Sequence, residues 1–554
     1  MWHFAQKQTL RFIILLLLIV AGKDGFGQHE ADNWYFGSNA ALNFGSGSPV
    51  SLTNSAMVAL KGCTTVSDSD GNLLFYSNGI RVWNKNHTEM QNGFGLFADE
   101  LASQSALGLK APGFANLYYL FTIGGLNSPP LERGAYYSVI DMSLDGGRGS
   151  VLSWQKNIPL QGADSAMEVI TAVASADQDG FWVFVRSFSA TNKLLAYLVD
   201  ASGVHQAPVV SSCLRNQSFL QQAGTVKASS DGRYMVFGPS AWSLNLPVTE
   251  LYKLNNATGE VSPVVLFNSG GINWGAEFSA NSEYLYIAGE EAQSSTSVIN
   301  QYDMSKTASA TTFQNSKTLI NALQGAPKYW QCQMAPDGKI YISQFSFSPS
   351  FSKYLSVIKE PSKKGSLCNF QANTVVLVSG TCMMGLPTFV QSYFVRFTWT
   401  GECKNSGTQF TSNFNPVPDS IYWNFGDLSS GVLNFSKEFN PVHIFSDSGS
   451  FNVKAKAFNA NGHQEEAMRI VKISAQPDVS LGPDRFVCPN TMVTIDAGSG
   501  FTKYQWSTGQ VTQTIQVADT GMFWVDVFNN KACRGSDSIH IACFLHLKLM
   551  NQPS

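Results

Sequence analysis

The stretch Ser229-Ser-Asp231-Gly232-Arg-Tyr-Met-Val-Phe237 places an Asp-Gly turn directly before a strand of aromatic and aliphatic residues. Gly and Asp tolerate the positive backbone φ that tight turns need, so this pairing is a strong hairpin signal. The same turn and strand recur along the chain, with the marker residue at Asp70, Asp179, Asp231, Asn281 and Asp337. The last three gaps are 52, 50 and 56 residues, and the first gap of 109 leaves room for one more copy near Lys110–Gly113.

A second pattern follows each copy: a strand, usually with a tyrosine, that ends at Asp or Asn before a turn. It occurs at Tyr137–Asp141, Leu195–Asp200, Leu251–Asn255 and Ile299–Asp303. Each unit of about 50 residues therefore contains four antiparallel strands, which is the size of one β-propeller blade.

Counting these units predicts how the ring closes. Complete units begin near residues 62, 104, 168, 222, 273 and 329. Trp34–Phe36 and Ala41–Phe44 are strands that lack a first strand, and we expect Pro387–Phe394 to supply it. A seventh blade built from both ends would remove an exposed sheet edge. We predict a seven-bladed propeller over residues 28–394, with a six-bladed ring or an open solenoid as alternatives.

The composition agrees with an all-β protein. Only 14% of the 554 residues are charged, against about 25% in an average soluble protein. The chain has 47 glycines and 12% aromatic residues, which favour short strands and tight turns over helices. The 39 acidic and 36 basic residues give a net charge of −3, so we expect no nucleic-acid partner.

The N-terminus predicts export. Lys7 and Arg11 precede an apolar run from Phe12 to Ala21, and the small-residue stretch Gly25–Gly27 follows. This order is typical of a secretory signal, which we assign to residues 1–27, and an uncleaved anchor is the alternative. No later stretch is apolar and long enough to span a membrane. We therefore expect a secreted or cell-surface protein without a transmembrane segment after signal cleavage.

Two small modules follow the propeller. Residues 395–475 contain Trp423-Asn-Phe-Gly-Asp427 and Pro441-Val-His-Ile-Phe445, and they closely resemble the PKD domain, an immunoglobulin-like sandwich. The sequence departs from that family at Leu428, where Gly is common, and at Phe445, where Tyr is usual.

Residues 476–543 carry Trp506 between two cysteines, the pattern of a second Ig-like sandwich, and 544–554 form a tail. Of nine cysteines, we expect Cys488 and Cys533 to form a disulfide, and the other connectivities stay open.

The three parts together resemble a group of secreted Bacteroidota proteins with a propeller, PKD or Ig-like modules and often a sorting domain of the type IX, gliding-associated secretion system. The resemblance rests on Asn33–Gly37, Gly71–Tyr76, Val82–Asn86, Ala335–Tyr341 and Gly385–Pro387. It implies surface or extracellular placement and no particular activity. The chain ends at Ser554, where the family usually continues, so we expect the sorting domain to be lacking and type IX export stays open.

Aligning the units predicts a binding site at one mouth of the propeller. The residues just before each innermost strand fall at equivalent places: Lys61, Gln104, Glu168, Gln222, Trp274, Trp330 and, in the closing blade, Met384. Tryptophans beside amides and a carboxylate would suit a glycan or a peptide, because they offer a flat apolar face with hydrogen-bond partners at its rim. The alternative is that the tryptophans only pack between blades.

No catalytic, metal or cofactor motif is present. Asp68-Ser-Asp70-Gly71-Asn72 is similar to a calcium loop, but it lacks the bidentate Glu and we expect it to stabilise a turn. We expect no cofactor and no metal.

Three functions remain. The favoured one is an exported, non-enzymatic binding or adhesion protein for an extracellular glycan or protein. The second is a glycoside hydrolase or lyase, which needs two carboxylates about 5–10 Å apart in the channel. The third is a protein–protein scaffold of the cell surface.

Overall fold

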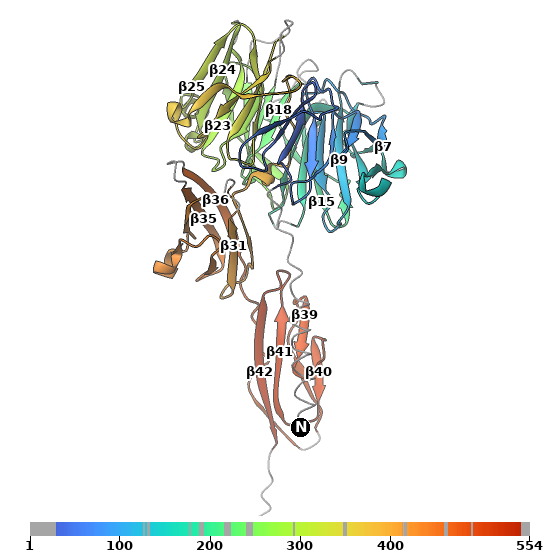
Figure 1. Ribbon diagram of the computed structural model, residues 1–554. Helices are drawn as coiled ribbons and strands as arrows, with labels where there is room; N and C mark the ends of the chain where they lie inside the picture. The colour runs from blue at the N-terminus through green and yellow to red at the C-terminus, as the bar shows by residue number, and fades with distance from the viewer. Residues whose placement is uncertain are drawn as a thin grey trace, which may run out of the picture. The chain divides into compact units, whose positions relative to one another are not determined.

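The computed structural model describes residues 29–543, except 126–127, 130–132, 177–178, 188–192, 215–222, 240–247, 292–293, 347–351, 413, 415–417, 459–463 and 489–490 (Figure 1). The expected signal sequence, the tail and Gln222 lie outside the described residues. Over the part of the chain that is described, none of the helices has the length and hydropathy needed to cross a bilayer.

Seven antiparallel sheets confirm the seven-bladed propeller, and the innermost strands of six blades begin within two residues of the predicted positions. A single parallel pair, Ser150 with Gln91, joins the second and third sheets. The sheets are β1–β3 (Asn33–Phe36, Ala40–Asn43, Val50–Leu52), β4–β7 (Thr64–Ser67, Leu73–Ser77, Arg81–Asn84, Glu89–Phe94), β8–β12 (Ala106–Lys110, Leu117–Gly124, Gly134–Asp141, Ser150–Val151, Ile158–Pro159), β13–β17 (Ala166–Ala174, Phe181–Ser187, Lys193–Asp200, Gly203–Val204, Val209–Ser212), β18–β21 (Gly224–Ala228, Tyr234–Pro239, Val248–Asn255, Glu260–Asn268), β22–β25 (Gly271–Phe278, Tyr284–Glu291, Thr296–Asp303, Thr318–Gln324) and β26–β29 (Lys328–Met334, Ile340–Phe345, Tyr354–Ile358, Phe370–Val376).

The repeated Asp turns stabilise the blades through their carboxylates. The Asp231 carboxylate accepts hydrogen bonds from the Ser229 hydroxyl at 2.6 Å and the Arg233 backbone N–H at 3.1 Å, and Gly232 follows with a φ of 70°. At the end of β24, the Asp303 carboxylate accepts the Ser305 backbone N–H at 2.9 Å. Both patterns recognised in the sequence are therefore turns that the side chain of Asp or Asn closes.

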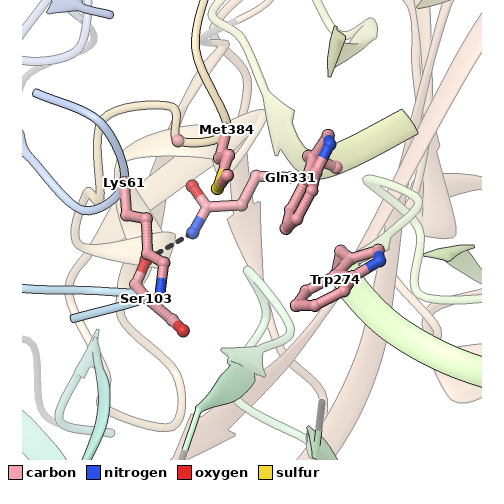
Figure 2. Close-up of a pocket in the computed structure, with 7 residues that line it drawn as sticks. Lys61, Ser103, Trp274, Gln331 and Met384 are labelled. Carbon is pink, nitrogen blue, oxygen red and sulfur yellow. Dashed lines mark hydrogen bonds between the residues drawn. The ribbon is translucent and has the colours of Figure 1, made fainter. Parts of the chain in front are cut away.

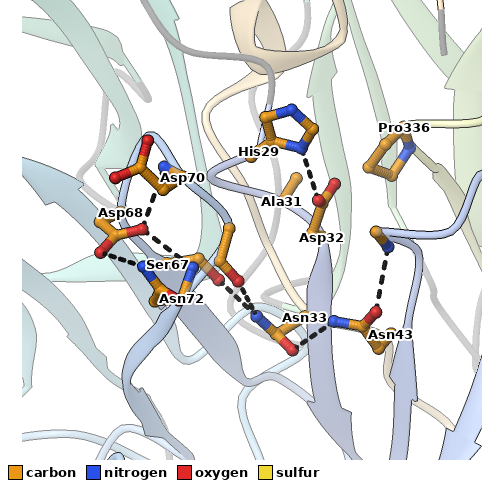
Figure 3. A network of polar contacts seen from close by, with 12 residues as sticks. His29, Ala31, Asp32, Asn33, Asn43, Ser67, Asp68, Asp70, Asn72 and Pro336 are labelled. Carbon is orange, nitrogen blue, oxygen red and sulfur yellow. Dashed lines mark hydrogen bonds and ion pairs between the residues drawn. The ribbon is translucent and has the colours of Figure 1, made fainter. Parts of the chain in front are cut away.

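Polar side chains attach the N-terminal sheet to the next blade (Figure 3). The Asn33 amide donates to the Ser67 hydroxyl at 3.0 Å and to the Gly71 carbonyl at 2.8 Å, and its oxygen accepts from Asn43 at 2.8 Å. The Asp68 carboxylate accepts the Asn72 backbone N–H at 2.8 Å, which confirms its expected role in the turn.

The closing segment differs from the predicted regular strand. Pro387 and Val390 form isolated parallel bridges with Cys63 and Ala172, and Gln391–Phe394 forms the 3-10 helix η7. Pro387 has no N–H to donate, so it cannot take part fully in a strand ladder. The seventh blade therefore consists of β1–β3 and an irregular inner segment.

This closing segment contacts five of the seven blades. The Thr388 carbonyl accepts from Thr64, the Ser392 hydroxyl accepts the Ala174 backbone N–H at 3.0 Å, and Tyr393 hydrogen-bonds to the Lys110 backbone. Its other two partners are Trp34, which packs against Phe389, and the Pro336 carbonyl, which accepts from Arg396 at 2.7 Å. Lys110 and Ala174 end their innermost strands, so the segment runs to the end of the ring at which those strands finish.

The contacts divide the chain into two compact units. The first contains the propeller up to Thr398 with residues 412–420 and 456–467, and the second contains 399–411, 421–455 and the chain from Met468 onward.

The PKD-like module has two sheets, β30-β31-β34 (Phe397–Thr400, Gly407–Ser412, Val442–Ile444) and β33-β32-β35-β36 (Phe435–Ser436, Ser420–Asn424, Gly449–Phe458, Gln464–Ile473). Trp423 and Phe445 are fully buried, as the family resemblance implies. The buried Asp427 carboxylate accepts the Ser446 backbone N–H at 2.8 Å and lies 3.1 Å from His443 Nε2. Leu428 begins the 3-10 helix η8 (Leu428–Asn434), an exposed turn whose apolar side chains Leu428, Val432 and Leu433 face solvent.

The last module is a second sandwich with the sheets β37-β42-β41-β39 (Arg485–Val487, Arg534–Cys543, Gly521–Phe528, Lys503–Trp506) and β38-β40 (Val493–Asp496, Thr514–Val517). Trp506 lies in its core, and the indole N–H donates to the Thr512 carbonyl at 2.8 Å.

The disulfide prediction is wrong. Cys533 bonds to Cys403, which joins the two small modules across 130 residues, and Cys488 is an exposed thiol. Cys533 lies just before the first residue of β42. Cys488 lies near the other end of this strand, because the preceding residue, Val487, pairs with Cys543. A strand of ten residues is about 33 Å long, so Cys488 and Cys533 are too far apart to bond.

Candidate functional site

The structure brings the predicted mouth residues to one level of the ring. Backbone hydrogen bonds join neighbouring blades at this level, from Gly62 to Ala102, Gln104 to Glu168, Gln331 to Met384 and Met384 to Leu60. Lys61 and Gln104 precede their innermost strands as predicted, whereas Glu168, Trp274 and Trp330 lie within theirs, two or three residues after the strand begins. Lys61, Gln104, Glu168, Trp330 and Met384 therefore belong to one rim, as the alignment of the units predicts.

β-Bulges turn side chains of this rim toward the mouth. The register of β22 against β23 shifts between Asn273 and Gly275, and the register of β26 against β27 shifts between Tyr329 and Cys332. A bulge adds a residue to one strand and re-aims its side chain. Gly275 permits the close approach of β22 to β26, because a Cβ at this position would lie 2.4 Å from the Trp330 carbonyl oxygen.

A small pocket lies at this rim (Figure 2). In Figure 2, Trp274 faces Lys61 and Ser103 across it, so one wall is aromatic and the other polar. Its volume is about 20 Å³, room for roughly one water molecule. The lining residues are Lys61, Ser103, Trp274, Trp330, Gln331, Met384 and Gly385.

The two tryptophans pack against each other. Their ring centroids are 4.1 Å apart, and Trp274 and Trp330 are only 8% and 5% exposed. Phe345, Met383 and Met384 complete this cluster. The packing alternative raised from the sequence therefore describes most of their surface, and the remaining surface of both lines the pocket.

Gln331 and Ser103 are site residues that the alignment missed by one position. The Gln331 amide donates to the Ser103 carbonyl at 2.6 Å, and its oxygen accepts the Leu386 backbone N–H at 2.8 Å. This side chain therefore joins three segments of the rim. The only sequence signal for Gln331 and Ser103 is that each adjoins a residue that the alignment did identify, Trp330 and Gln104 respectively.

Gln104 holds the ring together instead of facing the pocket. Its amide donates to the Val226 carbonyl at 3.2 Å, and its oxygen accepts the Val226 backbone N–H at 2.9 Å. Lys227, one residue further, contacts Gln333 at 2.7 Å and Glu277 at 3.1 Å. Buried polar side chains thus fill part of the interior between β18, β22 and β26.

Glu168 carries a perturbed carboxyl beside the pocket. Burial raises its pKa, the Lys61 ammonium at 3.9 Å lowers it, and the neighbouring Asp99 raises it further. A Cβ at Gly125 would lie 2.7 Å from the Asp99 carboxylate and 3.2 Å from the Glu168 Cγ, so both acids adjoin the same point. The sequence alignment did not identify Asp99.

Within the described ranges, no group of three or more His, Cys, Asp or Glu side chains could hold a metal ion.

Comparison with known proteins identifies one part of the chain. No curated protein matches the sequence. Similar solved structures include hydrazine synthase of Kuenenia stuttgartiensis (9% identity, 69% of this chain and 95% of that chain, TM-score 0.33) and periplasmic gluconolactonase of Pseudomonas aeruginosa (13%, 67% and 86%, TM-score 0.30). A third is the exo-β-1,3-galactanase of Phanerochaete chrysosporium (8%, 82% and 92%, TM-score 0.28). These values give no information on function. Residues 396–471 match the PKD domain, so this segment is a PKD domain that follows a propeller.

Proposed function

We propose that the chain is an exported, non-enzymatic recognition protein whose propeller mouth binds an extended peptide of a partner protein. The observation that carries this proposal is the pocket with an aromatic wall at Trp274 and a polar wall at Lys61 and Ser103. Protein interfaces combine such an apolar core with a polar rim. The two sandwich modules serve as spacers.

The size of the pocket favours a peptide over a glycan. A volume of about 20 Å³ does not accommodate a sugar ring, whereas a peptide can cross the rim and insert one small group. Hydrogen bonds from Gln331 and Gln104 hold the rim in place before binding, which lowers the entropic cost of association.

Export is part of this proposal. The basic and apolar N-terminal stretch supports it, and so does the Cys403–Cys533 disulfide, because disulfides persist mainly in oxidising compartments. We extend the proposal to membership in the Bacteroidota group with type IX, gliding-associated secretion, on the sequence motifs given above.

A peptide array and a glycan array probed with the full chain test the mouth. Lys61, 25% exposed, is changed to Ala, and exposed Lys85, which lies in the turn between β6 and β7, is changed to Ala as the control. We expect Lys61→Ala to weaken binding of the captured peptide about two- to fivefold and Lys85→Ala to leave it unchanged. Binding only to glycans, or an equal effect of both variants, would contradict the peptide assignment. No binding on either array would favour the scaffold function.

A second candidate function, a carbohydrate-active enzyme, has one observation in its favour. Asp99 and Glu168 adjoin the same point beside the pocket, and burial raises the pKa of Glu168, as in the general acid of a glycosidase. Release of reducing ends from a panel of polysaccharides tests it. If the chain is such an enzyme, Glu168→Gln lowers the rate at least about a hundredfold and Lys85→Ala does not. The absence of any release by the unmodified chain would reject this function.

A further inference from the structure

The second sandwich presents an aromatic face on its four-stranded sheet. Along β41, Met522 and Trp524 are exposed, whereas Phe523, Val525 and Val527 lie in the core. This alternation is that of a strand with one face on the core and one face in solvent. Trp524 is 40% exposed, unlike the buried pair of the propeller.

The strand register assembles the rest of this outer face. Met522 pairs with His540, and Trp524 pairs with Ser538. Phe486 pairs with Ala542 on the other side of β42 and is also exposed. Phe486 and Trp524 lie two strands and about four residues apart, so the face is roughly 17 Å long.

Two hydrogen bonds to Ser507 fix the backbone position of Trp524. Its N–H donates to the Ser507 hydroxyl at 3.3 Å, and its carbonyl accepts the Ser507 N–H at 2.9 Å. The indole therefore stands on a paired strand, with the Ser507 hydroxyl beside its backbone.

The charges of the face cancel. Arg534 pairs with Asp526 at 2.7 Å. Asp484, which accepts the His540 backbone N–H at 2.9 Å, and Lys503, which lies over Phe528, add one negative and one positive charge. A face with two charges of each sign offers no electrostatic attraction to a strongly acidic or basic partner.

Polar and apolar groups alternate on this surface. Serine hydroxyls and the His540 imidazole lie between Trp524, Met522 and Phe486. A sugar chain has the same mixture, because its rings present weakly positive C–H groups to an aromatic face and hydroxyls at their edges. The apolar η8 turn of the PKD domain, with Leu428, Val432 and Leu433 exposed together, lacks this alternation.

We propose that the outer face of β37, β42, β41 and β39 binds a neutral polysaccharide, with Trp524 stacked on one sugar ring and Met522 and Phe486 beneath neighbouring rings. This site lies on another module and takes another class of ligand than the propeller mouth, so it goes beyond the function proposed above.

Electrophoresis of the full chain through native gels tests this site. The gels contain a neutral soluble β-glucan, a neutral galactomannan or, as an acidic comparison, alginate. We expect at least one neutral polysaccharide to retard the chain, and Trp524→Ala to weaken that retardation about five- to tenfold. Trp154, which is 73% exposed on the propeller, provides the matched control, and Trp154→Ala should migrate like the unmodified chain.

Several outcomes would overturn the proposal. They are no retardation by any neutral polysaccharide, retardation by alginate alone, and equal retardation of Trp524→Ala and the unmodified chain. Gel filtration adds a fourth: a dimer that Trp524→Ala converts to a monomer, without polysaccharide binding, would assign the face to self-association.

Retardation that Lys61→Ala removes and Trp524→Ala does not would place the sugar site in the propeller mouth. A peptide-binding defect in Lys61→Ala with normal retardation supports both sites independently.

Discussion

The candidate sites of the propeller and of the second sandwich use tryptophan differently, and the two parts of the chain also differ in their disulfides. The propeller buries Trp274 and Trp330 against each other and keeps its described cysteines as thiols. The sandwiches expose Trp524 and are joined by the Cys403–Cys533 disulfide. A ring of seven blades buries enough apolar surface to be stable without covalent links, whereas small modules gain from a cross-link. The difference teaches that Trp274 and Trp330 contribute mainly to packing, whereas Trp524 lies at the surface of its module.

The largest expected effect is on the buried tryptophans. Trp330→Ala should lower the free energy of unfolding of the propeller by about 3–5 kcal/mol, because it removes a large side chain from a packed cluster. Trp524→Ala should change the stability of its module by only about 0.5 kcal/mol. Urea unfolding followed by circular dichroism measures both changes in the free energy of unfolding. Equal losses in the two variants would contradict the distinction between a packing tryptophan and a surface tryptophan.

Loss of the disulfide should have the next largest effect. Cys403→Ser should destabilise the sandwich modules by about 2–4 kcal/mol, since the unfolded chain is no longer constrained by a loop of 130 residues. Calorimetry should show the transition of the sandwiches at lower temperature and that of the propeller unchanged. Cys488→Ser, which removes an exposed thiol, is the control and should have no effect.

Acid should destabilise the PKD domain. Burial lowers the pKa of His443 below its ordinary 6.5, and this effect outweighs the opposing effect of Asp427. Below pH 6.5 the unfolded chain therefore binds a proton at this histidine more readily than the folded domain does, so the folded domain loses stability as the pH falls. Burial alone would raise the pKa of Asp427, but hydrogen bonds from Ser446 and His443 outweigh it and hold the pKa below 3.8. Stability is then lost further as the pH falls below 3.8. His443→Phe should remove the first loss, which thermal unfolding between neutral pH and about pH 5 would show.

Glu168 should have the smallest effect on stability, and its pH dependence should be opposite to that of His443. Its pKa in the folded propeller is raised, so the protonated form is favoured and stability is lost as the pH rises from 4.5 through the folded pKa. Glu168→Gln should therefore stabilise the propeller at neutral pH and have no effect below pH 4.5. Destabilisation by this variant at neutral pH would instead show that the ion pair with Lys61 outweighs burial.

The repeats made most of the fold predictable. Asp-Gly turns act locally, so Asp231 and its equivalents located the blades within two residues. The spacing also placed Lys61, Glu168 and Trp330 on one rim. The irregular segment at Pro387 and the bulges at Trp274 and Trp330 depend on contacts between distant strands, which a repeat pattern does not contain.

The site residues show the same limit. An alignment of units identifies which residues share a level, but side-chain orientation decides which of them meet the pocket: Gln331 lines it beside Trp330, whereas Gln104 bonds to Val226 instead. The Cys488–Cys533 prediction was wrong because it assumed that two cysteines bracketing one module bond to each other, whereas the position along β42 decides the pairing.

The closing segment between Thr388 and Arg396 also determines how the propeller bears tension. Its bonds to Thr64, Lys110, Ala174 and Pro336 lie on four different blades. A force applied to the chain beyond Arg396 reaches the ring through bonds to four blades, whereas a single edge strand would pass it to one neighbouring strand only. The ring should therefore keep its shape under a pull that would unravel a propeller closed by a single edge strand.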